Sequence, residues 1–199
     1  MTDMWSVEGA LFAQGYEFIC GVDEAGRGPL AGPVCAAAVI LPVGIEIPGL
    51  DDSKKLSPKK RDMLVDIIQE KAVSFGIAYA GVEEIERLNI LEATYLAMNR
   101  AIAQLDPQPQ LALIDGNRNK GIELDSRTLV KGDSLSAQIA AASILAKVSR
   151  DRYMLEQAEI YPQYHFDKHK GYGTAAHYDA IREHGPCPLH RPSFLRKMH

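Results

Sequence analysis

The sequence predicts an α/β fold built on one mixed β-sheet. Three strand-like segments come early, at 17–23, 34–41 and 74–80, and two later ones, at 111–114 and 128–131, are separated by helical segments. Consecutive early strands can pair antiparallel, whereas strands that return through a helix can run parallel. A chain of 199 residues fits one domain, with room for a small appendage.

The strand predictions depend on apolar patterning. Residues 34–41 are eight apolar residues in a row, which is typical of a strand buried on both faces. In 74–80 large side chains alternate with glycine and alanine, so the period is two. Residues 17–23 and 111–114 are short apolar segments that lead into acidic residues.

Caps and the spacing of apolar residues predict the helices. Ser57 and Pro58 suit the cap and first turn of a helix that runs to about residue 72. Residues 83–105 carry an apolar stripe with a break near Asn89; a coiled coil is the alternative, but packing on a sheet is favoured because the stripe is short. Further helices are expected at 5–16, 135–158 (thin, because it is rich in alanine), 174–184 and 193–198.

Composition argues against several classes of protein. No apolar run approaches the roughly 20 residues that span a bilayer, and residues 1–10 lack the basic residues of a secretory signal. Three cysteines without C-x-x-C spacing indicate free thiols in a reducing cytoplasm. The net charge of −4 argues against nonspecific polyanion binding, but the segment from Lys147 to His199 holds 9 Lys/Arg against 6 Asp/Glu.

Acidic residues follow or open several of the predicted elements. Asp23 and Glu24 end the first strand, Asp115 ends the fourth, and Asp133 follows the fifth. Carboxylates at the ends of adjacent parallel strands meet at one edge of a sheet, where open α/β folds bind ligands. A site of oxygen ligands without sulfur or histidine suits Mg²⁺ or Mn²⁺, and two such ions can hydrolyse a phosphodiester.

Each acid also has a plainer interpretation. Asp133 could equally cap the helix that follows, and Asp115 with its Gly-Asn is a common turn sequence. Asp151 lies about 27 Å further along an unbroken helix, so we expect it to pair with Lys147 rather than to bind metal.

Asp23 and Glu24 are harder to dismiss, because charge beside an apolar strand needs compensation. Neighbouring strand residues point to opposite faces, so the two can share a site only if the strand twists or ends there. We therefore expect an irregular strand end before Gly26.

The segment Gly26-Arg27-Gly28 follows these acids. Its glycines do not have the G-x-G-x-x-G spacing of a dinucleotide-binding loop, and the next element is a strand. Glycine permits a backbone to approach a sugar or phosphate closely. A flexible turn is the commoner explanation of a lone G-x-G.

Other basic and aromatic residues are weaker candidates. Lys54 and Lys55 can contact phosphates, although a solvated loop is the more frequent explanation. Tyr172, beside Lys170, can stack on a sugar or base, or can simply close the edge of the core. His169 and its neighbouring histidines are not expected to hold zinc, since no cysteine pair accompanies them.

Taken together, the motifs resemble bacterial ribonuclease HII from Gly21 to about Phe194. Each motif is weak alone, but their order is specific: GVDEAGRGP at 21–29, DSKKL at 52–56, LNIL at 88–91, IDGN at 114–117, KGD at 131–133, AASILAKV at 141–148 and HKGYGT at 169–174.

The resemblance implies a ribonuclease H-like fold, with a five-stranded mixed sheet in a catalytic part at 1–160 and a small helical, substrate-contacting region at 161–199. It implies an endonuclease that cuts the RNA strand of RNA–DNA hybrids, nicks 5′ to single ribonucleotides in duplex DNA, and leaves a 3′-hydroxyl and a 5′-phosphate. The protein would act as a monomer in the cytoplasm.

The resemblance also implies roles for particular residues. Metal ions, Mg²⁺ or Mn²⁺, would be held by the four acids, the glycine-flanked arginine would sense the 2′-hydroxyl, and Tyr172 would pack at the RNA–DNA junction. Two rivals remain: another metal-dependent nuclease or strand-transferase of this fold, and a nucleic-acid binding module with an inactive site. Intact carboxylates at Asp23, Glu24, Asp115 and Asp133 argue against the second.

Overall fold

A computed structural model describes residues 4–196 and contains one five-stranded sheet. The strand order is β3-β2-β1-β4-β5. Strand β1 pairs antiparallel with β2 and parallel with β4; β2–β3 is antiparallel and β4–β5 parallel. The predicted mixed sheet is therefore confirmed, with these strands: β1 Ile19–Ala25, β2 Val34–Ile40, β3 Ser74–Ala80, β4 Leu111–Asp115 and β5 Ser126–Leu129.

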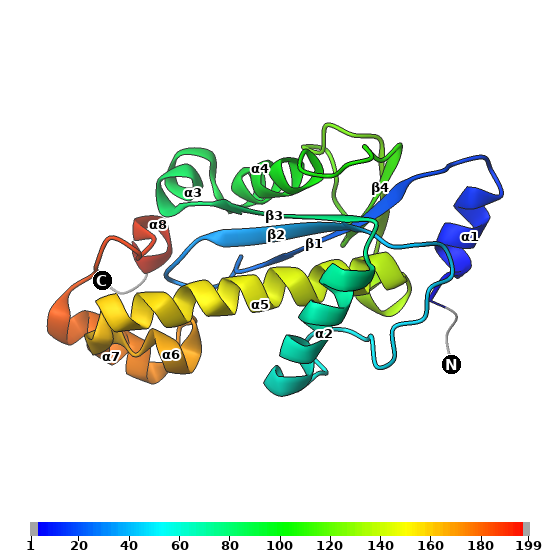
Figure 1. Cartoon of the computed structure of the whole chain (residues 1–199). Helices are drawn as coiled ribbons and strands as arrows, with labels where there is room; N and C mark the ends of the chain where they lie inside the picture. The colour runs from blue at the N-terminus through cyan, green and yellow to red at the C-terminus, as the bar shows by residue number, and fades with distance from the viewer. Residues whose placement is uncertain (1–3, 197–199) are drawn as a thin grey trace.

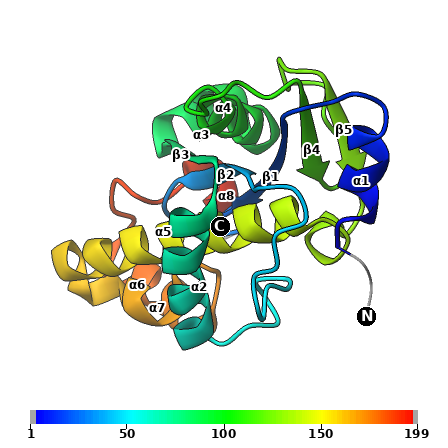
Figure 2. The ribbon, with the colours of Figure 1, turned by 45° about the vertical axis from the view of Figure 1, so that its right-hand side comes forward.

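Helices cover both faces of the sheet (Figure 1). On one face lie α3 (Val82–Leu88) and α4 (Ile90–Ile102); on the other lie α5 (Ala137–Ile160) and α2 (Pro58–Lys71). Figure 2 shows α1 (Ser6–Phe12) beside β5 at the sheet edge. The C-terminal elements gather at the far end of α5: the 3₁₀ turn Pro162–Tyr164, α6 Phe166–His169, α7 Ala175–His184 and α8 Pro192–Leu195.

Strand β2 explains the longest apolar run in the sequence. Ala36 and Ala38 face α4, whereas Ala37 and Val39 face α5, and all seven residues of the strand are buried. Because both faces are covered, the strand carries no polar residue. In the neighbouring strand β1, the absence of a side chain at Gly21 lets α5 approach closely. A methyl carbon on Gly21 would lie 2.2 Å from the Gln138 carbonyl carbon.

Helix α4 packs on the sheet through its apolar stripe, so the coiled-coil alternative is wrong. The predicted segment 83–105 is two helices, α3 and α4, which meet at Asn89. This residue has φ 73°, and its side chain accepts hydrogen bonds from Leu91 N and Glu92 N at the start of α4. The break near Asn89 was predicted, and its cause is this cap.

Several boundaries differ from prediction. Strand β1 begins two residues later and continues through Ala25, β5 lies at 126–129 rather than 128–131, and α1 ends at Phe12, before Gly15, instead of running to 16. Helix α8 begins at Pro192, and residues 197–198 of the predicted last helix lie outside the described residues.

The start of α5 corrects one interpretation of Asp133. The helix is capped by Ser136, whose Oγ accepts from Ile139 N at 3.1 Å. Asp133 instead lies in the 3₁₀ turn Gly132–Ser134, which precedes Ser136 in the chain. Asp133 is therefore not the cap of this helix. No helix within residues 4–196 is long and apolar enough to cross a membrane.

Candidate metal and nucleic-acid site

The four predicted acids come together at one edge of the sheet. Val22 pairs with Ile114 in the parallel ladder, so the next residues, Asp23 and Asp115, are neighbours. Asp115 Oδ1 accepts a hydrogen bond from Gly132 N at 2.7 Å, which ties the turn carrying Asp133 to the end of β4. The sheet register and this one bond therefore position three of the acids.

Glu24 reaches the edge from the other face. Val22 packs toward α4, and side chains alternate along a strand, so Glu24 shares that face while Asp23 faces α5. The strand stays paired as far as Ala25 and then breaks at Gly26, which has φ 98°. The irregular strand end expected at the two acids is therefore not found there: Asp23 and Glu24 are regularly paired with β2, and the irregular backbone begins only at Gly26.

Negative charge is crowded at this edge. Burial raises the pKa of Asp23 well above its usual range, and the charges of Glu24 and Asp115 raise it further. Burial also raises the pKa of Glu24, although Arg27 opposes the shift. The pKa of Asp133 is raised by burial and by the charge of Asp115. Ionised together, these acids favour binding of a cation.

Positive side chains only partly offset this charge. Arg27 Nη1 lies 3.3 Å from Glu24 Oε1, and half of the Arg27 side chain is exposed. Partial burial lowers the pKa of Lys54, but the charges of Asp23 and Asp133, with those of Asp52 and Asp115, outweigh it and leave the pKa raised. Lys54 lines the same hollow as Asp23 and Glu24.

The other two candidate lysines lie differently. Lys55 Nζ pairs with Asp51 Oδ1 at 3.0 Å and lies 3.4 Å from Ser134 Oγ, beside the acidic edge rather than in it. Lys170 donates from its Nζ to the Asp167 carbonyl, and its own carbonyl accepts from Arg150. The backbone of Lys170 thus has a clearer structural role than its ammonium group.

The donor set fits a hard divalent cation. All four side chains offer carboxylate oxygens, which Mg²⁺ and Mn²⁺ prefer. Among residues 4–196, however, no three His, Cys, Asp or Glu side chains are already placed to hold one ion. The backbone therefore gathers the acids at one edge, but their side chains do not form a ready set of ligands in the described part of the chain.

Two hollows flank the acids. One, of about 230 Å³, is lined by Asp23 and Glu24 together with Gly26, Arg27, Gly28, Lys54, Lys147 and Tyr172. The other, of about 360 Å³, lies on the α4 side and is lined by Glu24, Arg27, Tyr95, Asp115 and the turn 116–118, among others. Glu24 and Arg27 border both, so the two hollows adjoin at these residues, with Asp23 in one and Asp115 in the other; Asp133 lines neither.

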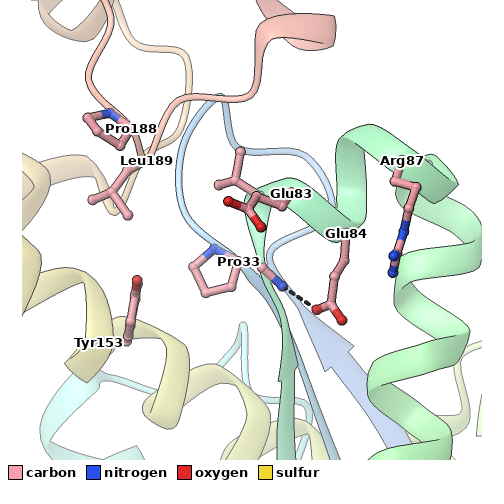
Figure 3. A pocket seen from close by; sticks show the side chains of 9 residues that line it. Pro33, Glu83, Glu84, Arg87, Tyr153, Pro188 and Leu189 are labelled. Carbon is pink, nitrogen blue, oxygen red and sulfur yellow. Dashed lines mark hydrogen bonds between the residues drawn. The ribbon is translucent and has the colours of Figure 1, made fainter.

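A wider cavity of about 610 Å³ lies elsewhere, between the start of α3 and the segment Pro188–Leu189 (Figure 3). One of its acids already has partners: Glu84 accepts from Gly81 N and forms an ion pair with Arg100 at 2.7 Å. Size alone does not identify the reactive site, because this cavity contains none of the crowded carboxylates.

Some residues at the site were not singled out from the sequence. Asp52 adds charge beside Asp133, and Lys147 lines the smaller hollow. The predicted pairing of Lys147 with Asp151 is confirmed at 2.7 Å. Asp52 could have been found from its place before Ser53-Lys54-Lys55, whereas nothing local marks Lys147.

Comparison with known proteins gives a consistent result. A family model described as Ribonuclease HII matches residues 20–197. A protein named Ribonuclease HII from Endomicrobium trichonymphae is 53% identical over 194 residues, which cover 97% of this chain and 92% of that protein.

Solved structures show the same fold. The crystal structure of ribonuclease H2 from Pyrococcus horikoshii OT3 has a TM-score of 0.75 at 24% identity, covering 92% of this chain and 97% of that chain. Bst-RNase HIII in complex with Mn²⁺ has a TM-score of 0.65 at 20% identity, covering 87% and 65%. At these identities the likeness concerns the fold alone.

Proposed function

Because the chain belongs to the ribonuclease HII family and is an endonuclease of the ribonuclease H type, we propose that it cuts the RNA strand of RNA–DNA hybrids and also nicks duplex DNA 5′ to a single embedded ribonucleotide. The products would carry a 3′-hydroxyl and a 5′-phosphate. One observation carries the proposal: the backbone brings four acidic residues to one edge of the sheet, beside a loop that contains Gly26 and Gly28.

Asp23, Glu24, Asp115 and Asp133 would hold the metal ions. Mg²⁺ or Mn²⁺, once bound, would supply Lewis-acid stabilisation of the negative charge that builds up on the phosphodiester. The chain itself contributes the fixed backbone of β1 and β4 that orients Asp23 and Asp115. Lys54, which lines the same hollow as Asp23 and Glu24, would help attract the phosphate.

Gly26, Arg27 and Gly28 would recognise the ribose. The 2′-hydroxyl distinguishes RNA from DNA at a given position, and a backbone without side chains can approach it closely. Tyr172 lies at the rim of the same hollow with its side chain 44% exposed. Its ring is available to stack on the sugar or base next to the ribonucleotide.

The C-terminal region, residues 161–199, would therefore contact substrate while residues 1–160 carry the catalytic acids. We further propose that the protein acts as a monomer in the cytoplasm. Lys55 and Lys170 would contact the nucleic-acid backbone only at the margin of the site, since both ammonium groups already have partners.

The test compares wild type with Asp115→Asn on three duplexes: a long RNA–DNA hybrid, DNA with one ribonucleotide, and all-DNA. Wild type with Mg²⁺ or Mn²⁺ should cut the first two only. Asp115→Asn should lose cleavage, by about 10²–10³-fold or more, and still bind the hybrid, because an amide removes charge with little change of shape. Near wild-type cleavage by Asp115→Asn would refute the metal assignment, and cutting of all-DNA duplex would favour a different nuclease.

A further inference from the structure

Two arginines are buried behind the substrate-facing loops. Arg150 on α5 is 1% exposed and Arg191, just before α8, is 0% exposed. Within residues 4–196 neither guanidinium forms an ion pair with a carboxylate; both donate to backbone carbonyls instead. A buried charge is tolerated only when hydrogen bonds compensate it, so these contacts are an essential part of the fold.

Arg150 joins two loops that are distant in sequence. Its Nε and Nη2 donate to the carbonyls of Pro33 and Ala31, and its Nη1 donates to the carbonyl of Lys170, each at 3.0 Å. We call residues 26–33 the glycine loop and residues 169–173 the tyrosine loop. One planar guanidinium therefore fixes the spacing between the two loops.

Arg191 binds the backbone carbonyls of the glycine loop. It donates to the carbonyls of Gly26 at 2.6 Å, Arg27 at 3.0 Å and Gly32 at 2.7–2.9 Å. Its backbone N–H donates to the Leu30 carbonyl at 2.8 Å. Because the carbonyls on either side of Arg27 point inward to this guanidinium, the loop is held in one curled conformation.

The two loops also touch directly, with no room for side chains. Leu30 N donates to the Gly171 carbonyl at 2.8 Å. A methyl carbon on Gly26 would lie 2.0 Å from Arg150 Nε, and one on Gly171 would lie 2.5 Å from the Ala31 carbonyl oxygen. Both glycines have positive φ, 98° and 84°. The contact therefore depends on glycine in each loop.

Arg150 also contacts the aromatic ring itself. Its guanidinium carbon lies 5.9 Å from the centre of the Tyr172 ring, within the range of a cation–π interaction. The same side chain thus binds the Lys170 carbonyl, two residues before Tyr172, and contacts the Tyr172 ring, while Tyr172 remains 44% exposed.

We propose that Arg150, supported by Arg191, is a positioning residue that locks the tyrosine loop to the glycine loop, so that the ribose and the junction beside it are recognised at one fixed spacing. This inference rests on the proposed function for its effect on cleavage. The locking of the loops is a property of the free protein and can be measured without substrate.

The first experiment measures amide hydrogen exchange in full-length Arg150→Lys, with Arg152→Lys as the matched control. Lysine keeps the charge but cannot reach three carbonyls at once. Exchange at Leu30 and Tyr172 should speed up together by about tenfold, as expected for loss of a charged hydrogen bond. Arg152 lies on the same helix but forms an exposed pair with Asp62, so its lysine variant should match wild type. Unchanged exchange in Arg150→Lys, or faster exchange in one loop only, would overturn the proposal.

The second experiment measures kcat/KM on DNA with one ribonucleotide and on a long RNA–DNA hybrid. Arg150→Lys should lower the ratio of the first to the second by about tenfold. When Tyr172→Ala is already present, Arg150→Lys should lower this ratio no further, because Arg150 acts by positioning the Tyr172 ring. Tyr172→Phe should lose less than Tyr172→Ala. An unchanged ratio, or fully additive effects, would overturn the positioning role.

The two experiments separate the two proposals. If wild type fails to cut DNA containing one ribonucleotide, the proposed function is wrong and the exchange result alone decides whether the loops are locked. If wild type cuts both substrates and Arg150→Lys behaves like Arg152→Lys in both experiments, only the positioning role is lost.

Discussion

The acidic edge of the sheet and the two loops joined by Arg150 both contain buried charge, but only in the loops is that charge compensated by hydrogen bonds. At the edge, Asp23 and Asp133 are 7% and 6% exposed, and the charge of Asp115 raises the pKa of both carboxyls. In the loops, the Arg150 and Arg191 guanidiniums are just as buried, yet their donors have carbonyl partners. The first region keeps uncompensated negative charge, as the proposed cation site requires, whereas the buried charges of the second already have hydrogen-bond partners.

The comparison indicates that substitutions in the two regions should affect stability and activity differently. A region with uncompensated charge is arranged for a ligand, and neutralising it should stabilise the free protein. A region with compensated charge is arranged for rigidity, and disturbing it should cost both stability and activity. The following substitutions test each half of the comparison.

The largest effect is expected for Asp23→Asn. Cleavage should fall by about 10²–10³-fold or more, because a proposed metal ligand is lost. In the absence of metal, Tm should nevertheless rise by about 2–4 °C, which corresponds to about 1 kcal/mol in a chain of this size. Calorimetry of both proteins measures this. Mg²⁺ should stabilise wild type more than the variant, and a lower Tm in the metal-free variant would contradict the comparison.

Gly26→Ala should damage both regions at once. Its methyl group would collide with Arg150, and φ of 98° is strained for alanine. We expect a loss of about 1–3 kcal/mol in the free energy of unfolding and about 10²-fold in cleavage.

Gly44→Ala is the matched control for Gly26→Ala. It also has positive φ, 71°, but a methyl group there meets nothing within 4 Å. Gly44→Ala should lower the free energy of unfolding by about 1 kcal/mol and leave cleavage unchanged. Urea denaturation and cleavage of a hybrid measure both quantities, and equal behaviour of the two variants would show that the contact with Arg150 does not matter.

The smallest effect concerns the histidines behind the tyrosine loop. His177 Nδ1 donates to the Tyr172 carbonyl at 2.9 Å, so its Nε2 accepts from His190 Nε2, 3.0 Å away. This arrangement needs a neutral His177, and burial lowers its pKa from 6.5 to about 4. Its contribution to stability is therefore present above about pH 6.5 and lost as the pH falls toward 4.

In His177→Asn, which can still donate to that carbonyl, the free energy of unfolding should depend less steeply on pH between 6.5 and 4. Urea denaturation at a series of pH values compares the slopes. The Arg152→Lys variant is the control, because it changes neither a histidine nor a carboxyl group, so its slope should match that of wild type. Equal slopes in His177→Asn and wild type would show that His177 does not couple the loop to pH.

Much of the fold was determined by the sequence alone. The eight-residue apolar run predicted a doubly buried strand, and the alanine-rich segment predicted a thin helix that packs closely, because both patterns follow directly from local geometry. The acids were found for the same reason: a carboxylate that ends an apolar strand is conspicuous at any position in the chain. The motif order also indicated the family.

Only the tertiary structure decided how these parts meet. Ser136, not Asp133, caps α5, and the register of β1 with β4 places Asp23 beside Asp115. Arg150 and Pro33 are 117 positions apart, and Arg191 and Gly26 are 165. Their acceptors are backbone carbonyls, which every residue possesses, so no side-chain pattern marks them; only folding brings those carbonyls together around a guanidinium.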